Sequence, residues 1–300
     1  MEDFIHLHVH TQYSILDGQS KIPHLVDKAI KDGMKGMAVT DHGVMFGIKE
    51  LADYCANVNK GRKKEGLEPF KPIIGCEMYV AHRRKEDREK DKGDMSGYHL
   101  IVLAKNYNGY KNLIKLVSNS WVDGYYMRPR TDRADLEKYH EDLIVCSACI
   151  AGEVPKKIIQ GDIEGAREAC EWYHRVFGDD YYLELQRHEV TNPDPNYLAN
   201  REAFPLQQKA NKVLIEFAKE YGIKLICTND CHFEDKETAE AHDHLLCIAT
   251  GKDLDDPNRM RYSKQEWFKT REEMNAIFSD VPEALSNTLD IYNKVEIYSI

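Results

Sequence analysis

The amino-acid sequence predicts an α/β fold in which seven short strands alternate with helices and close into a barrel. Apolar runs rich in β-branched or aromatic residues recur along the whole chain and are bounded by Gly, Pro, Asn or Asp, as strands are. Between them lie segments whose apolar residues are three and four positions apart, which is the spacing of amphipathic helices. This alternation indicates parallel strands joined by crossover helices.

The elements follow in a regular order. We predict strands at residues 4–10, 36–40, 72–80, 98–103, 142–148, 180–186 and 222–228. We predict helices at residues 20–32, 47–60, 108–120, 161–176, 204–220 and 236–249. Two stretches interrupt the alternation and are expected to be surface loops: the charge-dense one from Arg83 to Asp94 and the polar one at 191–196.

Composition limits the class of protein. The 300 residues, of which 42% are hydrophobic and 31% charged, suit one large soluble domain or two small ones. No stretch approaches the roughly eighteen apolar residues of a membrane span, so we expect a cytoplasmic protein without a membrane partner. The eight cysteines are scattered along the chain, which predicts free thiols. A net charge of -10 argues against a protein that coats nucleic acid, but not against a metalloenzyme acting on phosphates.

Residues that bind metals recur beside the predicted strands. Alternate residues of a strand share a face, so His8 and His10 can bind the same ion. Similar side chains follow along the chain, namely Asp17, His42, Glu77, His99, Cys149, Asp230 and His232. A β/α barrel gathers the strand ends around one pocket, whereas an open doubly wound sheet would spread them along an edge. We therefore favour the barrel, with a site for two or more ions.

Neighbouring residues receive separate predictions. His6 lies on the same strand face as His8 but deeper, so we expect it to bond within the core or brace a ligand. Asp41 either orients a ligand or caps a helix. Cys231 should point away from the site, between Asp230 and His232. Of the pair Cys146 and Cys149, one is expected at the rim and one in the core.

The segment from 125 to 133 is locally basic and aromatic, which suits phosphate contact and base stacking. Within it, Arg128 and Arg130 are predicted to contact nucleic acid. The alternative is a solvated loop.

Several motifs together resemble one family. They are His8-Val9-His10, Thr40-Asp41-His42-Gly43, Gly75-Cys76-Glu77, Tyr98-His99-Leu100, Ser147-Ala148-Cys149 and Asn229-Asp230-Cys231-His232. As a set they resemble the PHP (polymerase and histidinol phosphatase) superfamily. The stretches 13–18 and 123–130 are similar to the versions found in bacterial replicative DNA polymerases, with Asp17 where phosphatase members often carry histidine.

The resemblance implies a distorted seven-stranded (β/α)7 TIM-like barrel of the PHP type. It also implies two or three divalent ions (Zn, Mn or Fe) held by the nine ligand-type residues above. Residues 1–270 would form the barrel, and 271–300 a helical segment leading toward an absent polymerase palm. The implied partners are DNA at its 3′ end, the rest of the polymerase chain and a proofreading subunit.

The function implied by this resemblance is a metal-dependent phosphoesterase working as a 3′-5′ exonuclease, with DNA synthesis located elsewhere in the longer chain. Glu77 is expected to bridge the ions, and His99 or Asp230 to move a proton. Two alternatives stay open. One is a structural module that docks a proofreading subunit, and the other is a phosphomonoesterase of the histidinol phosphatase type.

Overall fold

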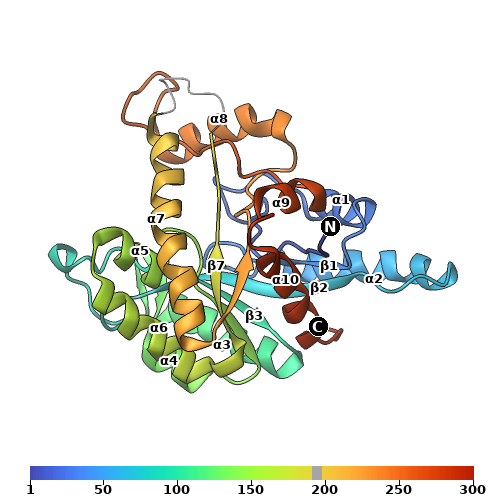
Figure 1. The fold of residues 1–300 in the computed structure, drawn as a ribbon, viewed down its shortest axis with the longest axis horizontal. Helices are drawn as coiled ribbons and strands as arrows, with labels where there is room; N and C mark the ends of the chain where they lie inside the picture. Colours follow the sequence, from blue (N-terminus) through green and yellow to red (C-terminus); the bar gives the residue numbers. More distant parts are fainter. Residues whose placement is uncertain (191–197) are drawn as a thin grey trace.

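A curled sheet forms the centre of the structure, a computed structural model that describes residues 1–190 and 198–300 (Figure 1). Its strands are β1 (Gly36–Val39), β2 (Lys71–Val80), β3 (Tyr98–Ala104), β4 (Tyr125–Tyr126), β5 (Arg128–Thr131), β6 (Leu143–Cys146), β7 (Tyr181–Leu185) and β8 (Lys224–Cys227). The predicted loop at 191–196 lies outside the described residues.

The helices that cover this sheet are α1 (Ile22–Lys31), α2 (Ile48–Lys64), α3 (Tyr107–Val122), α4 (Arg133–Lys138), α5 (Glu153–Gln160), α6 (Ile163–Phe177), α7 (Leu198–Tyr221), α8 (Ala239–Thr250), α9 (Arg271–Ile277) and α10 (Pro282–Lys294). All six predicted helices are present, with ends that differ by a few residues. The structure adds the helices α4 and α5 and the short hairpin of β4 and β5, while α9 and α10 lie in the segment 271–300 that was expected to be helical.

The strands close into a ring through the extended segment 4–10. The sheet runs in the order β4-β5-β2-β3-β6-β7-β8, with β1 also paired to β2. On one side of the segment, His6 O accepts a hydrogen bond from Ala38 N of β1 at 2.9 Å. On the other side, His10 N donates to Cys231 O, just past β8, at 2.7 Å. Segment 4–10 is therefore not the regular strand we predicted, but it is the seventh member of a distorted barrel.

The direction of β3 differs from the prediction of uniformly parallel strands. β3 pairs antiparallel with β2 on one side and with β6 on the other. The reason lies in the connection from β2, which contains no α-helix and cannot make the crossover that parallel strands need. As a result, the beginning of β3 lies at the rim where the other strands end.

The C-terminal helices pack on the barrel. Thr288 Oγ1 of α10 accepts from Ile5 N at 3.1 Å, and Asn287 Nδ2 donates to Leu225 O of β8 at 2.8 Å. Arg271 N, at the start of α9, donates to Asp32 Oδ2 at the end of α1 at 2.7 Å. Figure 1 shows both helices, in dark red, against the side of the barrel. The proposed boundary at residue 270 stays a prediction, but the helices beyond it share the core of the barrel.

Two further predictions concern the described residues as a whole. All eight cysteines are free thiols, and six of them are buried, as predicted. In the described ranges, no helix combines the length and the apolar character needed to cross a membrane.

Replacing the fully buried Ile291 of α10 by alanine should lower the free energy of unfolding by about 2 to 5 kcal/mol, because the substitution leaves a cavity in the core. Urea denaturation followed by circular dichroism measures this change. Asn293→Ala, at an exposed position of the same helix, should change stability by less than about 0.5 kcal/mol. Equal stability of both variants would mean that α10 is not part of the cooperative fold.

Candidate metal centre

Glu77 lies at the centre of the predicted ligands. Its side chain is buried in the middle of β2, rather than at the strand end. Glu77 Oε2 lies 2.7 Å from His8 Nε2 and 3.2 Å from His10 Nε2. Glu77 Oε1 lies 3.2 Å from His42 Nδ1 and also contacts His99 Nδ1. The two oxygens of one carboxylate thus face two different pairs of histidines.

A first group of ligand atoms surrounds Asp230. Its Oδ1 lies 3.1 Å from His8 Nε2 and 3.2 Å from His10 Nε2. The ligand atoms of these three residues and Glu77 all lie within 4.8 Å of one another. Asp230 has a positive φ of 48°, in the left-handed region that aspartate tolerates better than most residues. Such an unfavourable backbone at a cluster of ligands fits a position held for function.

The other predicted ligands adjoin this group. His10, His42 and His232 form a second group whose ligand atoms lie within 4.8 Å of one another. Asp17 Oδ2 lies 2.7 Å from His42 Nε2. Cys149 Sγ lies 3.7 Å from the ring of His99. The structure therefore brings all nine predicted ligands into one continuous cluster.

Unpaired polar atoms indicate that the cluster fits divalent cations. Asp17 Oδ1 is buried and makes no hydrogen bond, and Asp230 Oδ1 is buried against His8 and His10 without a well-aligned hydrogen bond to either. His8 Nε2 and His10 Nε2 face each other at 3.2 Å. Such atoms are costly to bury unless a cation or a proton binds between them. A mixed set of imidazole, carboxylate and thiol ligands suits zinc, iron or manganese.

Charge balance keeps the carboxylates of the cluster ionised. Burial acts to lower the pKa of His8, but Asp230 and Glu184 outweigh it and raise the pKa well above its ordinary value. Burial acts to raise the pKa of Glu77, but His99 and His42 outweigh it and hold the pKa well below its ordinary value. Burial and the nearby His10 lower the pKa of His232 to about 4, so this imidazole is neutral and can act as a ligand.

Glu184 is a supporting residue that the sequence analysis missed. Its Oε1 lies 2.7 Å from His8 Nδ1, and it also accepts from Gln186 Nε2 at 3.1 Å and from Thr228 Oγ1. A carboxylate at Nδ1 fixes the tautomer that leaves Nε2 free for a metal. The available signal was a glutamate inside the apolar strand β7, where an ionisable side chain needs a partner.

The neighbouring residues behave largely as predicted. Asp41 Oδ1 accepts from Ser14 Oγ at 2.7 Å, and Ser14 Oγ lies 3.1 Å from His10 Nδ1. Asp41 thus braces a ligand through Ser14, and the helix-cap alternative is wrong because the cap of α2 is Gly47.

His6 and Cys231 lie on the side away from the cluster. His6 Nε2 lies 2.7 Å from Lys269 O inside the core, and burial lowers the pKa of this imidazole to about 3. Cys231 Sγ lies 3.5 Å from His6 Nδ1. Of the other cysteine pair, Cys146 is fully buried in the core and Cys149 lies at the rim, as predicted.

Tyr262 was also missed, and no signal in the sequence marked it. Its hydroxyl donates to Asp17 Oδ2 at 3.2 Å and lies 3.3 Å from His232 Nε2. It belongs to the irregular segment between α8 and α9, which only the folded chain brings to the site.

The prediction that Arg130 contacts nucleic acid needs correction. Its side chain is fully buried, and it donates to Gly124 O at 3.1 Å, Lys85 O at 2.8 Å and Asp87 O at 3.0 Å. Arg130 would be exposed on β5 if the 83–94 loop were absent. The loop covers its side chain, and two of the loop's carbonyl groups accept its hydrogen bonds. Arg128 is exposed, with its guanidinium 5.5 Å from the centre of the Tyr79 ring, and stays a candidate.

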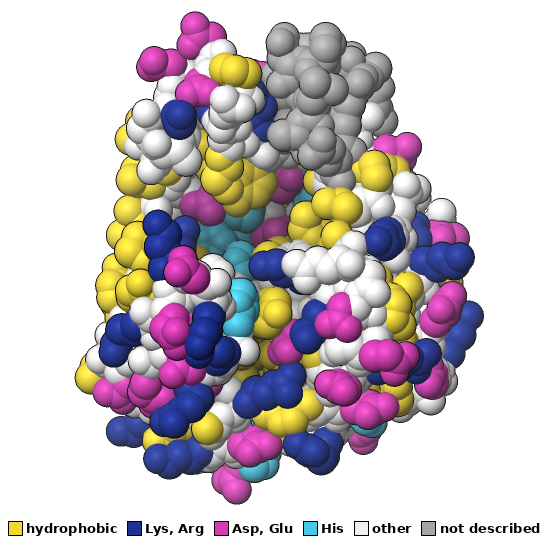
Figure 2. All heavy atoms as spheres, turned by 90° about the vertical axis from the view of Figure 1, so that its left-hand side faces the viewer, with side chains coloured by type: hydrophobic (Ala, Val, Ile, Leu, Met, Phe, Trp, Pro, Cys, Tyr) yellow, Lys and Arg dark blue, Asp and Glu magenta, His cyan; other side chains and the backbone are white. Residues whose placement is uncertain are grey.

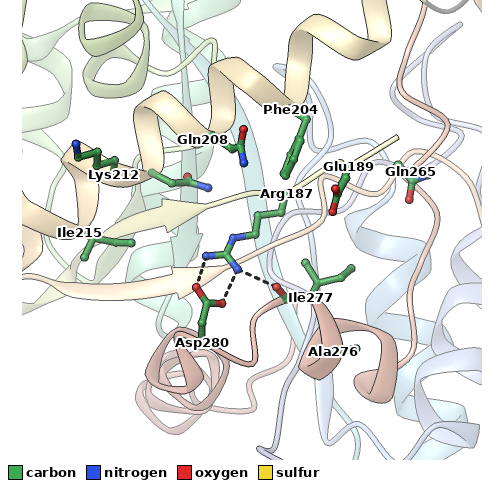
Figure 3. A pocket seen from close by; sticks show the side chains of 11 residues that line it. Arg187, Glu189, Phe204, Gln208, Lys212, Ile215, Gln265, Ala276, Ile277 and Asp280 are labelled. Atoms are coloured by element: carbon green, nitrogen blue, oxygen red, sulfur yellow. Dashed lines mark hydrogen bonds and ion pairs between the residues drawn. The ribbon is translucent and has the colours of Figure 1, made fainter. Parts of the chain in front are cut away.

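The cluster lies in a hollow of the surface. Figure 2 shows histidines and carboxylates at the bottom of this hollow, with hydrophobic and basic side chains around it. A separate cavity of about 800 Å³ lies between α7 and α9, where Arg187 pairs with Asp280 at 2.6 Å (Figure 3). None of the nine predicted ligands lines that cavity.

A barrel with a buried cluster of histidines and carboxylates that could hold metal ions defines a class of metal-binding α/β barrels. Comparison with known sequences identifies the family within this class. Residues 6–188 match the PHP domain family, and the chain belongs to that family.

The relatives that it matches are large proteins. The chain is 43% identical to DNA polymerase III subunit alpha of Borreliella burgdorferi over 99% of its own length and 24% of that protein. It is 39% identical to the subunit of the same name in Campylobacter jejuni, over 99% of this chain and 23% of that one, and 37% identical to that of Thermus aquaticus, over 98% and 23%. It thus spans about a quarter of these relatives. Among solved structures, PsfC from Pseudomonas syringae superposes with a TM-score of 0.41 at 14% identity, covering 77% of this chain and 78% of that one.

Glu184→Gln should weaken binding of zinc or manganese about 10- to 100-fold, because the neutral amide lacks the negative charge that makes the His8 imidazole a stronger ligand. Competition with a chromophoric chelator measures the affinity. Glu171→Gln, on the surface of α6, is the control and should bind as the unsubstituted chain does. Unchanged affinity in Glu184→Gln would remove Glu184 from the support of the site.

Arg130→Met should lower the free energy of unfolding by about 3 kcal/mol, since the carbonyl groups of Lys85 and Asp87 lose their donor and that of Gly124 keeps only a backbone N–H. Arg128→Met should leave stability within about 0.5 kcal/mol. Thermal unfolding compares the two variants. A larger loss of stability in Arg128→Met than in Arg130→Met would contradict the burial of Arg130.

Proposed function

We propose that this chain is a metal-dependent phosphodiesterase domain that removes nucleotides from the 3′ end of DNA as a 3′-5′ exonuclease. The observation that carries the proposal is the position of Glu77, whose two oxygens face two pairs of histidines. With its two oxygens so placed, Glu77 would help to hold two ions, which together would supply charge stabilisation at a phosphodiester. Membership of the PHP family supports a phosphoesterase.

The nine clustered residues would hold two or three ions of zinc, manganese or iron. When bound, these ions would acidify a water molecule and stabilise the charge on the phosphate. The chain itself determines the direction of approach. The side chains of Asp17, His42 and His99 are 21%, 16% and 22% exposed, whereas that of His8 is 0% exposed. A phosphate would therefore enter on the side of these three residues.

Proton transfer to the leaving oxygen has two candidates in this chain, His99 and Asp230. His99 is the more accessible, since the Asp230 side chain is 12% exposed and lies against His8 and His10. The guanidinium of Arg128 lies over the ring of Tyr79, and the centre of that ring is 5.2 Å from the centre of the His99 ring. Arg128 is therefore close to the exposed side of the cluster. It is our candidate for contact with a neighbouring phosphate.

The rest of a replicative polymerase would surround this domain. The relatives are named DNA polymerase III subunit alpha and are about four times as long, so DNA synthesis would belong to the remaining chain. We propose residues 1–270 as the metal-binding barrel and 271–300 as the segment leading toward the polymerase palm. DNA, the rest of the polymerase and a proofreading subunit would be its partners in the cytoplasm.

Nucleotide release from a 3′-labelled single-stranded DNA tests the activity. The purified chain with zinc or manganese should release nucleotides, and a His10→Ala, Asp230→Ala variant should do so at least about a hundredfold more slowly, since it loses ligands of the first group. His140→Ala, which removes an exposed histidine whose Nδ1 lies 2.7 Å from Glu137 O in α4, is the matched control and should keep full activity.

The other outcomes separate the alternatives. Bound metal and an intact fold without nucleotide release would favour a structural module that docks a proofreading subunit. Hydrolysis of p-nitrophenyl phosphate but not of DNA would favour a phosphomonoesterase.

A further inference from the structure

Two aromatic side chains lie exposed and stacked on the surface. The rings of Trp121, in α3, and Tyr125, in β4, are 5.4 Å apart between centroids and nearly parallel, at 17°. Their exposed fractions are 44% and 47%. Large aromatic groups usually bury most of their area, so an exposed stacked pair indicates a surface that binds something. We call Trp121 and Tyr125 the aromatic platform.

The platform is attached directly to the metal centre. Trp121 Nε1 donates to Gly43 O at 2.8 Å, and Gly43 N donates to Glu77 O at 2.7 Å. Gly43 also follows the predicted ligand His42. Its φ is +63°, and an added Cβ would lie 2.7 Å from Pro129 Cγ, so the loop fits closely against the β4–β5 hairpin. These contacts hold Trp121 against Gly43, the residue that follows His42 of the cluster.

A cation and further apolar groups border the same opening. In the β4–β5 hairpin, Tyr125 pairs with Pro129 and Tyr126 pairs with Arg128. Arg128 therefore lies one strand position from Tyr125, on the other face of the hairpin, with its guanidinium over Tyr79. In the loops that carry Asp17 and His42, Ile15 is 70% exposed and Phe46 is 60% exposed.

This combination suits single-stranded nucleic acid. Proteins hold such strands by stacking successive bases on aromatic rings while basic groups contact the backbone. We propose that Trp121 and Tyr125 stack on the bases next to the 3′ end of single-stranded DNA and so hold its last phosphodiester at the metal centre. This inference rests on the proposed function and adds the residues that position its substrate. Continuity with the cluster and the adjacent Arg128 favour DNA over a protein partner.

Binding of a 5′-fluorescein-labelled oligodeoxythymidylate with phosphorothioate linkages at its 3′ end tests the platform, with manganese present and anisotropy as the readout. Trp121→Ala and Tyr125→Ala should each weaken binding at least about fivefold, the lower end of what one stacked base contributes. Trp121→Phe should keep most of the affinity. Tyr107→Ala, which removes an exposed aromatic at the other end of α3, is the matched control and should bind normally.

Tryptophan fluorescence gives an independent measure. The other two tryptophans, Trp172 and Trp267, are 8% exposed, so quenching by the bases should come from Trp121 and disappear in Trp121→Phe while binding persists. A quenching signal that survives in Trp121→Phe would contradict stacking on this residue.

Hydrolysis of bis(p-nitrophenyl) phosphate, which has no bases, separates the platform from the metal centre. Tyr125→Ala should lose far more affinity for the oligonucleotide than rate on this diester, whereas Trp121→Ala also removes the hydrogen bond to Gly43 O beside His42 and is not used for this comparison. If the diester is cleaved normally but DNA binding is unchanged in the alanine variants, the platform proposal is wrong and the patch belongs to a protein contact. The same conclusion follows if the unsubstituted chain does not bind the oligonucleotide. If DNA binding depends on the platform but no diester is cleaved, the platform stands and the phosphodiesterase proposal fails.

Discussion

The hydrogen bonds of the extended segment 4–10 are the constraint on which the site depends. This segment joins β1 on one side and the chain just past β8 on the other, and it thereby closes the ring of strands. The same closure places His8 and His10 between Glu77, from the second strand of the chain, and Asp230, from beyond the last. The fold and the cluster are consequently one arrangement, since opening the ring would separate ligands more than 200 residues apart in sequence.

The strand and helix pattern and the residues of the cluster could be predicted from the sequence because each depends on local spacing. Alternation within 4–10 puts His8 and His10 on one side, and the same rule separates Cys231 from its two neighbours. Residues such as Tyr262 lie outside this rule. It comes from an irregular segment, and its place beside Asp17 depends on how the chain after α8 folds back.

The errors have physical causes as well. Arg130 lies in a basic and aromatic segment of the kind that contacts phosphates. Its burial depends on a charged loop whose backbone carbonyl groups accept its hydrogen bonds. The 83–94 stretch is a surface loop, as predicted, but ion pairs of Arg83 with Glu89 at 3.1 Å and with Asp94 hold it together. The direction of β3 was missed because strand patterns carry no sign of direction, and only the missing helix before it could have revealed the reversal.

That reversal has a consequence for how the domain can change over evolutionary time. Since β2 ends and β3 begins at the same rim, the connection between them stays at this rim instead of returning along the outside of the barrel. Residues inserted or deleted there would reshape the entrance without shifting any strand. Arg130 donates hydrogen bonds to Lys85 O and Asp87 O and so holds this part of the loop in place. The rest of the loop can vary while this part stays fixed. One barrel could in this way accept phosphate esters of different sizes through the length of a single loop.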